Sequence, residues 1–295
     1  MFELFFGEYL VEKNYITQEQ LDEVIEIQKS SRVKLGLIAV AEKMLTQSQA
    51  DSVNMLQATL DKRFGDIAVE KGYLTDEQVG KLLSLQGNPY MKFTQTVIEK
   101  NIMTLEQIEK YVQEYKNDNS FSDNDIDAIK SGDVDRIINV FIRTSSAYYD
   151  DYMGLAIRNI VRFITTSFSF KAPKKVNTYE YKYLGSQCVK GDHNVFTAFA
   201  SNDNALVELA NPYADENYTE VDDDAYDAVC EFINCINGLF ASKLSTNGID
   251  IDMLPPLTYN DGKLQSSEGF YVLPIKINNK CLDFIIAIDA ELEIQ

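Results

Sequence analysis

Apolar and polar positions follow the same order four times in the first third of the chain, at an interval of 29 residues. Gly7, Gly36, Gly65 and Thr94 occupy equivalent positions in the four copies. Each copy predicts two short helices, because an apolar run is followed by a turn, a threonine suited to an N-cap, and apolar residues at helical spacing. One helix pair of this size cannot bury its own apolar stripe, so neighbouring copies must cover it. We therefore predict an all-α tandem array of helix pairs over residues 1–116.

The regular pattern ends after Tyr115, and a polar segment follows. Residues 117–135 are rich in Asp, Asn and Ser and nearly without bulky apolar side chains. Such a composition is typical of a loop, so we expect a linker that holds no more than a short helical turn.

A different pattern begins after this segment. Residues 137–164 are apolar at helical spacing, and β-rich runs follow at 178–189 and 194–200. The chain closes with two more β-rich runs, joined by Asn278-Asn279, a pair that tolerates the positive φ of a tight turn. Helices and antiparallel hairpins in one domain predict an α+β fold with an antiparallel sheet over residues 136–295.

The segment 222–244 predicts a long helix with one apolar stripe and one polar face. The stripe comprises Val229, Phe232, Ile233, Ile236, Phe240 and Leu244. The opposite face carries, at steps of three and four residues, Asp227, Glu231, Asn234 and Gly238. Asn234, Asn237 and Gly238 are poor helix formers, so their place in mid-helix is a local cost that needs a reason. An ordinary solvated face would give the same pattern.

Charge and composition exclude several classes of function. The formal net charge is −19, which repels phosphate backbones, so we expect no nucleic acid as a partner. The single histidine, His193, excludes multi-histidine metal sites, and we expect no metal bound by the chain itself. The four cysteines form no CxxC pair, so we expect them to be reduced and buried. No apolar run reaches membrane-spanning length, and Glu3 and Glu8 interrupt the apolar start, so we expect a cytoplasmic protein without a membrane partner.

The repeats resemble the tandem motifs of the MshEN domain, the N-terminal module of type II secretion and type IV pilus ATPases. The third copy is most similar, with Arg63, Phe64, Gly65 and Gln86 in register. In that family, paired motifs bind cyclic di-GMP. The resemblance implies that a nucleotide would contact residues of copies two and three, namely Lys34, Gly36, Arg63 and Gly65.

The repeats also depart from the MshEN pattern. The arginine position holds Phe5 in copy one and lysine in copies two and four (Lys34 and Lys92), and the fourth glycine is Thr94. Lysine cannot reproduce the planar fork that arginine offers a guanine or a phosphate. We therefore expect cyclic di-GMP to bind weakly or not at all, and the array to tether or regulate the second domain.

The second domain resembles the CheC/CheX family of chemotaxis phosphatases. The resemblance rests on Glu231-x-x-Asn234-x-x-x-Gly238 and on Pro255-Pro256, which enters a strand. It covers roughly residues 136–295, and only one copy of the motif is present, so the domain is CheX-like.

In that family the helix face inserts into the active site of a phosphorylated response regulator. The resemblance implies that Asn234 orients the attacking water, that Glu231 pairs with a lysine of the regulator, and that Asp227 and Gly238 lie on the partner-binding face. The chain would need no cofactor of its own, since the Mg²⁺ would be held by the partner.

The leading hypothesis is a signalling protein that binds a phosphorylated CheY-like regulator and promotes hydrolysis of its aspartyl phosphate. One alternative is a non-enzymatic adaptor that binds response regulators or other proteins. A third hypothesis is a cyclic di-GMP sensor. We also expect a homodimer, because the resemblance implies pairing through the sheets and because the closing hairpin is long and apolar.

Overall fold

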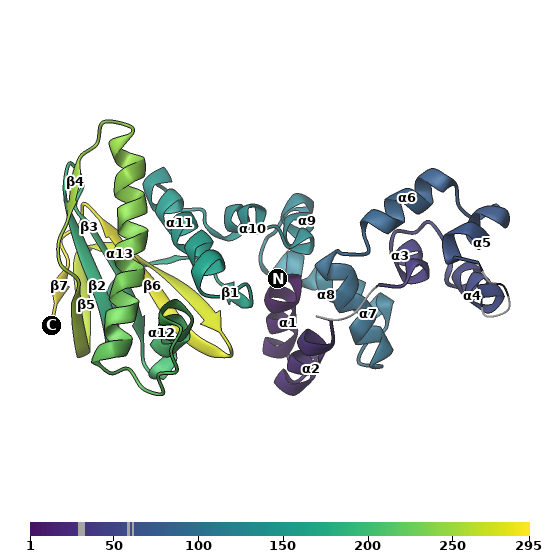
Figure 1. Ribbon diagram of the computed structural model, residues 1–295, viewed down its shortest axis with the longest axis horizontal. Helices are drawn as coiled ribbons and strands as arrows, with labels where there is room; N and C mark the ends of the chain where they lie inside the picture. Colours follow the sequence, from purple (N-terminus) through teal and green to yellow (C-terminus); the bar gives the residue numbers. More distant parts are fainter. Residues whose placement is uncertain (29–32, 58–59, 61) are drawn as a thin grey trace. The chain divides into compact units, whose positions relative to one another are not determined.

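The computed structural model of the protein describes residues 1–28, 33–57, 60 and 62–295. The chain forms two compact units, Met1–Asp133 and Val134–Gln295, the first helical and the second with an antiparallel sheet (Figure 1). None of the helices in the described part of the chain is long and apolar enough to cross a lipid bilayer.

Each of the four copies in the first unit forms the expected helix pair. The helices are α1 (Phe2–Glu12), α2 (Gln18–Gln28), α3 (Leu35–Ala41), α4 (Gln47–Gln57), α5 (Phe64–Glu70), α6 (Asp76–Ser84), α7 (Pro89–Glu99) and α8 (Leu105–Asp118). The second helix of every pair begins with a capping box. The N-cap threonine hydroxyl accepts a backbone N–H three residues later at 3.2 Å, and the glutamine there accepts the threonine N–H. The expected caps, Thr17, Thr46, Thr75 and Thr104, are therefore confirmed.

The copies pack in a nested order. Helices α3 and α4 of copy two pack with α5 and α6 of copy three, whereas α1 and α2 of copy one pack against α7 of copy four. Aromatic contacts fill the second interface. The Phe93 ring lies 5.7 Å from Phe2 and 6.0 Å from Phe6, and Tyr15 stacks on Tyr111 at 4.0 Å. The expected cover between neighbouring copies is found for copies two and three. Copy one is instead covered by the copy farthest from it in sequence.

The glycines of the repeats are explained by helix packing. A Cβ atom at Gly65 would lie 2.7 Å from Cγ1 of Val79, and one at Gly36 would lie 3.0 Å from the Phe64 ring. Real Cβ atoms essentially never show the distance found at Gly65, and the distance at Gly36 is tighter than most real contacts, so a side chain at either position would force its neighbours to shift. In copy four, Thr94 takes this position and is fully buried in α7.

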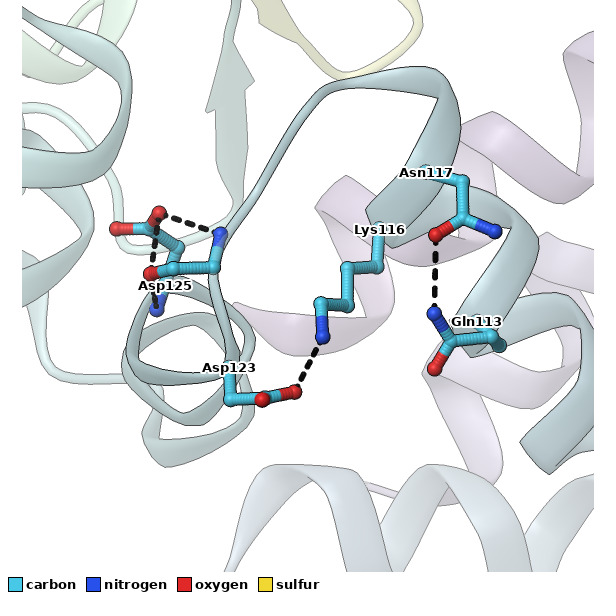
Figure 2. Close-up of polar contacts among 6 residues, drawn as sticks. Gln113, Lys116, Asn117, Asp123 and Asp125 are labelled. Carbon is cyan, nitrogen blue, oxygen red and sulfur yellow. Dashed lines mark hydrogen bonds and ion pairs between the residues drawn. The ribbon is translucent and has the colours of Figure 1, made fainter.

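The expectation of a linker at residues 117–135 is wrong over most of its length. Helix α9 (Asp123–Ser131) occupies it and packs against α1 and α7. Ser122 and Asp125 form its capping box, and Figure 2 shows the ion pair that joins Lys116 at the end of α8 to Asp123 at the start of α9. A capping box and two buried isoleucines, Ile126 and Ile129, are enough to fold this polar segment onto the array.

The second unit is an antiparallel sheet of strands of unequal length, with helices on one of its sides (Figure 1). Its helices are α10 (Val134–Phe141), α11 (Ala147–Phe163), α12 (Val207–Ala214) and α13 (Asp223–Ser245), with a 3₁₀ turn at Asn204–Leu206. Its strands are β1 (Phe168–Phe170), β2 (Lys174–Gly191), β3 (Val195–Ser201), β4 (Ile251–Met253), β5 (Leu257–Ile277), β6 (Lys280–Ile288) and β7 (Glu293–Ile294). The described strands follow the order β1-β5-β6-β3-β2-β4, and β7 pairs with β5. This arrangement agrees with the expected α+β fold.

The closing hairpin is formed by β5 and β6. Asn278 and Asn279 adopt φ values of 47° and 64°, as the tight turn requires. However, β6 also pairs with β3, and β5 also pairs with β1 and β2. The hairpin therefore lies inside the sheet, and our argument for a homodimer from an uncovered hairpin edge is wrong. A homodimer remains an expectation from the resemblance alone.

Alternation along the strands creates two apolar faces. Phe196, Ala198 and Ala200 of β3 point into a cluster on one face, with Ile285 and Ala287 of β6. The residues between them, including Phe199, point to the other face, where the Phe199 ring lies 5.7 Å from Phe232 of α13. The candidate site is built on this helix-covered face.

Candidate functional site

The candidate site lies on α13, which is uninterrupted from Asp223 to Ser245. Asp222 is its N-cap, and the side chain accepts the Ala225 N–H at 2.9 Å. The predicted apolar stripe is confirmed, since Val229, Phe232, Ile233, Ile236, Phe240 and Leu244 are all buried. Gly185 of β2 lets the helix approach the sheet, because a Cβ there would lie 3.1 Å from Val229.

The four residues predicted on the opposite face differ in their exposure. Asp227 and Glu231 are exposed, whereas Asn234 and Gly238 are half-buried. The polar face is therefore well exposed at Asp227 and Glu231 and partly covered at Asn234 and Gly238. Farther along the helix, this face lies against strands β2 and β4. A Cβ atom added at Gly238 would lie 3.9 Å from Cε of Met253.

Asn234 is half-buried because its side chain bonds to the sheet. Its Oδ1 accepts a hydrogen bond from Nε2 of Gln187 at 2.9 Å. The same Nε2 donates to the backbone carbonyl of Leu254, also at 2.9 Å. Gln187 lies on β2 and is 2% exposed, so Asn234 is joined to the interior of the domain.

The contacts of Gln187 continue into a buried polar network. Its Oε1 accepts from Nδ2 of Asn237 at 2.7 Å. Asn237 is 0% exposed, and its Nδ2 also donates to Oγ1 of Thr197 at 3.0 Å. The Oδ1 of Asn237 accepts the hydroxyl of Tyr152, which lies on α11. The network therefore joins α11, α13, β2 and β3 behind Asn234.

The sheet places Gln187 and Thr197 side by side. They are register partners across the β2–β3 pair, so both side chains point to the helix-covered face. The hydroxyl of Thr197 also donates to the backbone carbonyl of Gln187 at 3.3 Å. Two adjacent strands therefore present two acceptor oxygens, Oε1 of Gln187 and Oγ1 of Thr197, to Nδ2 of Asn237.

The network is uncharged at physiological pH. Burial raises the pKa of the Tyr152 hydroxyl, the titratable group of the network. Tyr152 therefore keeps its proton near neutrality, so the network supplies hydrogen bonds and fixed positions rather than acid–base chemistry.

The acidic run before the site lies away from Asn234 along the helix. Asp223 and Asp224 occupy the first turn of α13, where the helix dipole favours them. Asp223 is about 16 Å from Asn234 along the axis, at a rise of about 1.5 Å per residue. Because the screening length is about 8 Å at physiological ionic strength, this run does not directly oppose an anionic partner at Asn234.

Apolar side chains are exposed beside Asn234. Met253, Leu254 and Leu257 lie on the segment that leads from β4 into β5, and Leu257 is 55% exposed. The Leu254 carbonyl accepts from Gln187, which fixes this segment next to the half-buried amide. Leu239 adds a further exposed apolar side chain on α13.

The residues predicted for nucleotide binding are brought together in the array. Lys34, Gly36, Arg63 and Gly65 line one cleft of about 670 Å³ between copies two and three. Nζ of Lys34 pairs with Glu99 at 2.7 Å, so its charge is partly neutralised. The two glycines are required by packing against Phe64 and Val79, so they do not by themselves indicate a ligand.

Metal ligands are not gathered at either place. Within the residues that the structure describes, no group of three or more His, Cys, Asp or Glu side chains could hold a metal ion. His193 lies between β2 and β3 and pairs with Asp289 at 2.6 Å. The four cysteines are free, but only Cys230 among them is buried. Cys188 and Cys235 are half-buried and Cys281 is exposed, so our expectation that all four are buried is wrong for three of them.

Sequence reasoning missed Gln187, Thr197 and Tyr152, and it left Asn237 unexplained. A signal for Asn237 was present, because it falls four residues after Ile233 and three before Phe240, on the buried stripe. A polar residue at such a position needs buried partners. For Gln187, the signal was a long amide on the face of β2 that points to the helices.

Residues 183–276 match the family model of "Chemotaxis phosphatase CheX", a stretch that includes Gln187, Glu231 and Asn234 and no residue of the repeat array. No curated protein matches the chain. Similar solved structures include a chemotaxis protein CheX from Desulfovibrio desulfuricans, with 12% identity, 48% of this chain and 99% of that chain covered, and a TM-score of 0.42. CheX from Vibrio vulnificus has 14% identity, the same two coverages and a TM-score of 0.42. A CheX-CheY-BeF3-Mg²⁺ complex from Borrelia burgdorferi has 19% identity, 48% and 97% coverage, and a TM-score of 0.38. Residues 183–276 of the second unit thus match the CheX family model, and the solved structures that resemble the chain include CheX proteins.

Proposed function

We propose that the second unit binds a phosphorylated response regulator of the CheY type and promotes hydrolysis of its aspartyl phosphate. The observation that carries this proposal is the pair Glu231 and Asn234 on one uninterrupted helix, within the stretch that matches CheX. Glu231 is exposed and Asn234 lies one turn later with its amide tied to β2. An exposed carboxylate beside a positioned neutral amide suits recognition of a lysine and orientation of a water.

The reaction needs few groups from this chain. A water oxygen forms a bond to phosphorus while the bond between phosphorus and the aspartyl oxygen of the regulator breaks. The products are inorganic phosphate and the free carboxylate of the regulator. Such a transfer is accelerated mainly by positioning and by charge stabilisation. Asn234 would hold the water in line, and the regulator would supply its own Mg²⁺.

The surface around the pair suits a protein partner. Glu231 would fix the register of docking by pairing with a lysine of the regulator, and Asp227 lies exposed one turn before it. On the other side, Met253, Leu254 and Leu257 offer exposed apolar area, which is common at protein interfaces. A phosphorylated aspartate that reached Asn234 would therefore be flanked by a charged and an apolar contact.

Phosphate release from a labelled regulator tests the proposal. CheY-type regulators phosphorylated with acetyl phosphate would be mixed with the full chain, and the decay of the phosphoryl group would be followed. We expect faster decay with the wild-type protein and decay at the regulator's own rate with Asn234→Ala. Glu231→Ala should raise the regulator concentration needed for half-maximal rate, because it removes a binding contact.

The outcomes separate the enzyme from the adaptor. Binding of the regulator without any acceleration of decay would support a non-enzymatic adaptor and refute the phosphatase. Acceleration that survives the double substitution Glu231→Ala and Asn234→Ala would show that the site is elsewhere.

For the array, the cleft between copies two and three favours a second candidate function, the binding of a nucleotide. Arg63 and Lys34 both line it. Only copy three has arginine at its position, however, and Lys34 is already paired with Glu99. We therefore propose that the array mainly tethers or regulates the second unit, and that cyclic di-GMP binds weakly or not at all.

A further inference from the structure

The amide of Asn234 has only one orientation that satisfies its neighbours. Gln187 lies between two groups, the Leu254 carbonyl and the Asn234 side chain, each 2.9 Å from its Nε2 atom. The Leu254 carbonyl can only accept hydrogen bonds. The NH₂ group of Gln187 must therefore face it, and the atom of Asn234 that faces the same NH₂ group must be the acceptor Oδ1.

The other end of Gln187 fixes the same orientation independently. Its Oε1 accepts from Nδ2 of Asn237 at 2.7 Å. Asn237 cannot rotate its amide without loss, because its Oδ1 accepts the Tyr152 hydroxyl and its Nδ2 also donates to Thr197. The hydrogen bonds therefore fix which end of each amide donates and which accepts. The series begins at the Leu254 carbonyl and includes the amides of Gln187, Asn234 and Asn237.

Burial makes this orientation costly to change. Gln187 and Asn237 are shielded from water, as are Thr197 and Tyr152. A buried donor or acceptor that loses its partner costs about 1–3 kcal/mol, and rotation of one amide would break several bonds at once. Asn234 is therefore held in one conformation before any partner arrives.

We propose that Gln187 is a positioning residue that orients the Asn234 amide for the attacking water. This inference rests on the proposed phosphatase function of the same site. Gln187 occupies one lone pair of Asn234 Oδ1. Among the described residues, Nδ2 of Asn234 has no hydrogen-bond partner, so the NH₂ group and the second lone pair of Oδ1 remain for water and the phosphoryl group. Asn237, Thr197 and Tyr152 support Gln187 from behind.

The expected effect is on the chemical step rather than on binding. Gln187 is 2% exposed and does not touch a docked partner, so its loss should leave the affinity for the regulator unchanged. An amide that is free to rotate holds the water in line for a smaller fraction of the time. We expect kcat to fall about tenfold with KM unchanged, as for a group whose effect appears only in the transition state.

Two substitutions at Gln187 test the proposal. Gln187→Met keeps the length of the side chain and removes both donors, and Gln187→Glu keeps the length and presents oxygen to Asn234 in place of NH₂. The matched control is Ser201→Ala, which removes a buried hydrogen bond to the Asp203 carbonyl on β3, outside the network. We expect both Gln187 variants to lose kcat and Ser201→Ala to keep it, so a loss of kcat does not simply follow from a loss of melting temperature.

A double-mutant cycle with Asn234→Ala separates the possible results. If Gln187 acts through Asn234, Gln187→Met should lower kcat in the wild-type background and change nothing in the Asn234→Ala background. Gln187 variants that fold and retain full kcat, while Asn234→Ala is inactive, would overturn the positioning role and leave the proposed function intact. Wild-type activity in Asn234→Ala would instead refute the proposed function. If Gln187→Met does not fold, the Gln187→Glu arm decides by the same criteria.

Discussion

The replacement Asn237→Ala gives a measurable test of the buried network. Asn237 is 0% exposed and takes part in three hydrogen bonds, with Gln187, Thr197 and Tyr152. Its removal leaves two buried groups without their partners, the Oε1 of Gln187 and the hydroxyl of Tyr152, whereas Thr197 keeps its bond to a backbone carbonyl. At about 1–3 kcal/mol for each orphaned group, the loss is roughly 2–6 kcal/mol.

One opposing effect reduces this loss. Alanine is a better helix former than asparagine by about 0.7 kcal/mol, so the net expected loss is roughly 1.5–5 kcal/mol. This is a large part of the usual stability of a domain, about 5–15 kcal/mol. A unit of this size should then melt about 3–20 °C lower, at about 2–4 °C per kcal/mol.

The assay is urea unfolding of the full chain, followed by circular dichroism, with hydrogen exchange to assign the transition to residues 134–295. The matched control is Asn139→Ala, the same substitution at an exposed position of α10, where only the gain in helix propensity is expected. The reasoning is refuted if Asn237→Ala lowers the stability of the second unit no more than Asn139→Ala does.

Three further predictions concern the array and the sheet. Gly65→Ala should destabilise the array by about 1–3 kcal/mol through overpacking against Val79. Its control is Gly80→Ala in α6, where the new Cβ meets no neighbouring side chain within 4 Å, and which should stabilise the array by up to about 1 kcal/mol. Thermal melts in which both variants shift the melting temperature in the same direction would contradict the packing account. Burial raises the pKa of Asp283 despite the hydrogen bond from Tyr179. The folded state therefore binds the proton of the Asp283 carboxyl group more tightly than the unfolded state does. As a result, the stability of the folded protein falls as the pH rises from the unfolded pKa of this group through its folded pKa. Asp283→Asn should therefore raise the melting temperature at pH 7 and lose this advantage in acid, and an unchanged melting temperature at pH 7 would count against it. Titration calorimetry of the full chain with cyclic di-GMP should show no binding tighter than about 1 μM (about 8 kcal/mol), and tighter binding that disappears in Arg63→Ala would overturn this expectation.

The locally encoded parts of the fold were predictable from the sequence. The four helix pairs, the threonine caps, the stripe on α13 and the asparagine turn between β5 and β6 all depend on residues within a few positions of one another. Helix α9 was missed because its segment is polar, although Ser122 and Asp125 have the spacing of a capping box. Polar composition alone is therefore a poor indicator of a linker when a cap and two buried apolar residues are present.

The parts that depend on distant residues were not predictable in the same way. The copies have similar patterns, and nothing in the repeat pattern indicates that copy one pairs with copy four. For the site, the helical phase identified Glu231 and Asn234 but not Gln187, which lies 47 residues away from Asn234 on β2. Which amide reaches Asn234 depends on the register of β2 with β3 and on where α13 packs against the sheet. Neither can be predicted from the sequence of the helix alone.

The nested packing of the array has a consequence for how the chain folds during synthesis. Copies two and three can close on each other as soon as both have left the ribosome. Copy one must wait, because Phe2 and Phe6 are covered by Phe93 of copy four. At a synthesis rate of about 5–20 residues per second, the aromatic side chains at the start of the chain remain without cover for roughly 5–18 s. A chain that stopped after the third copy would carry an apolar first helix with its partner missing.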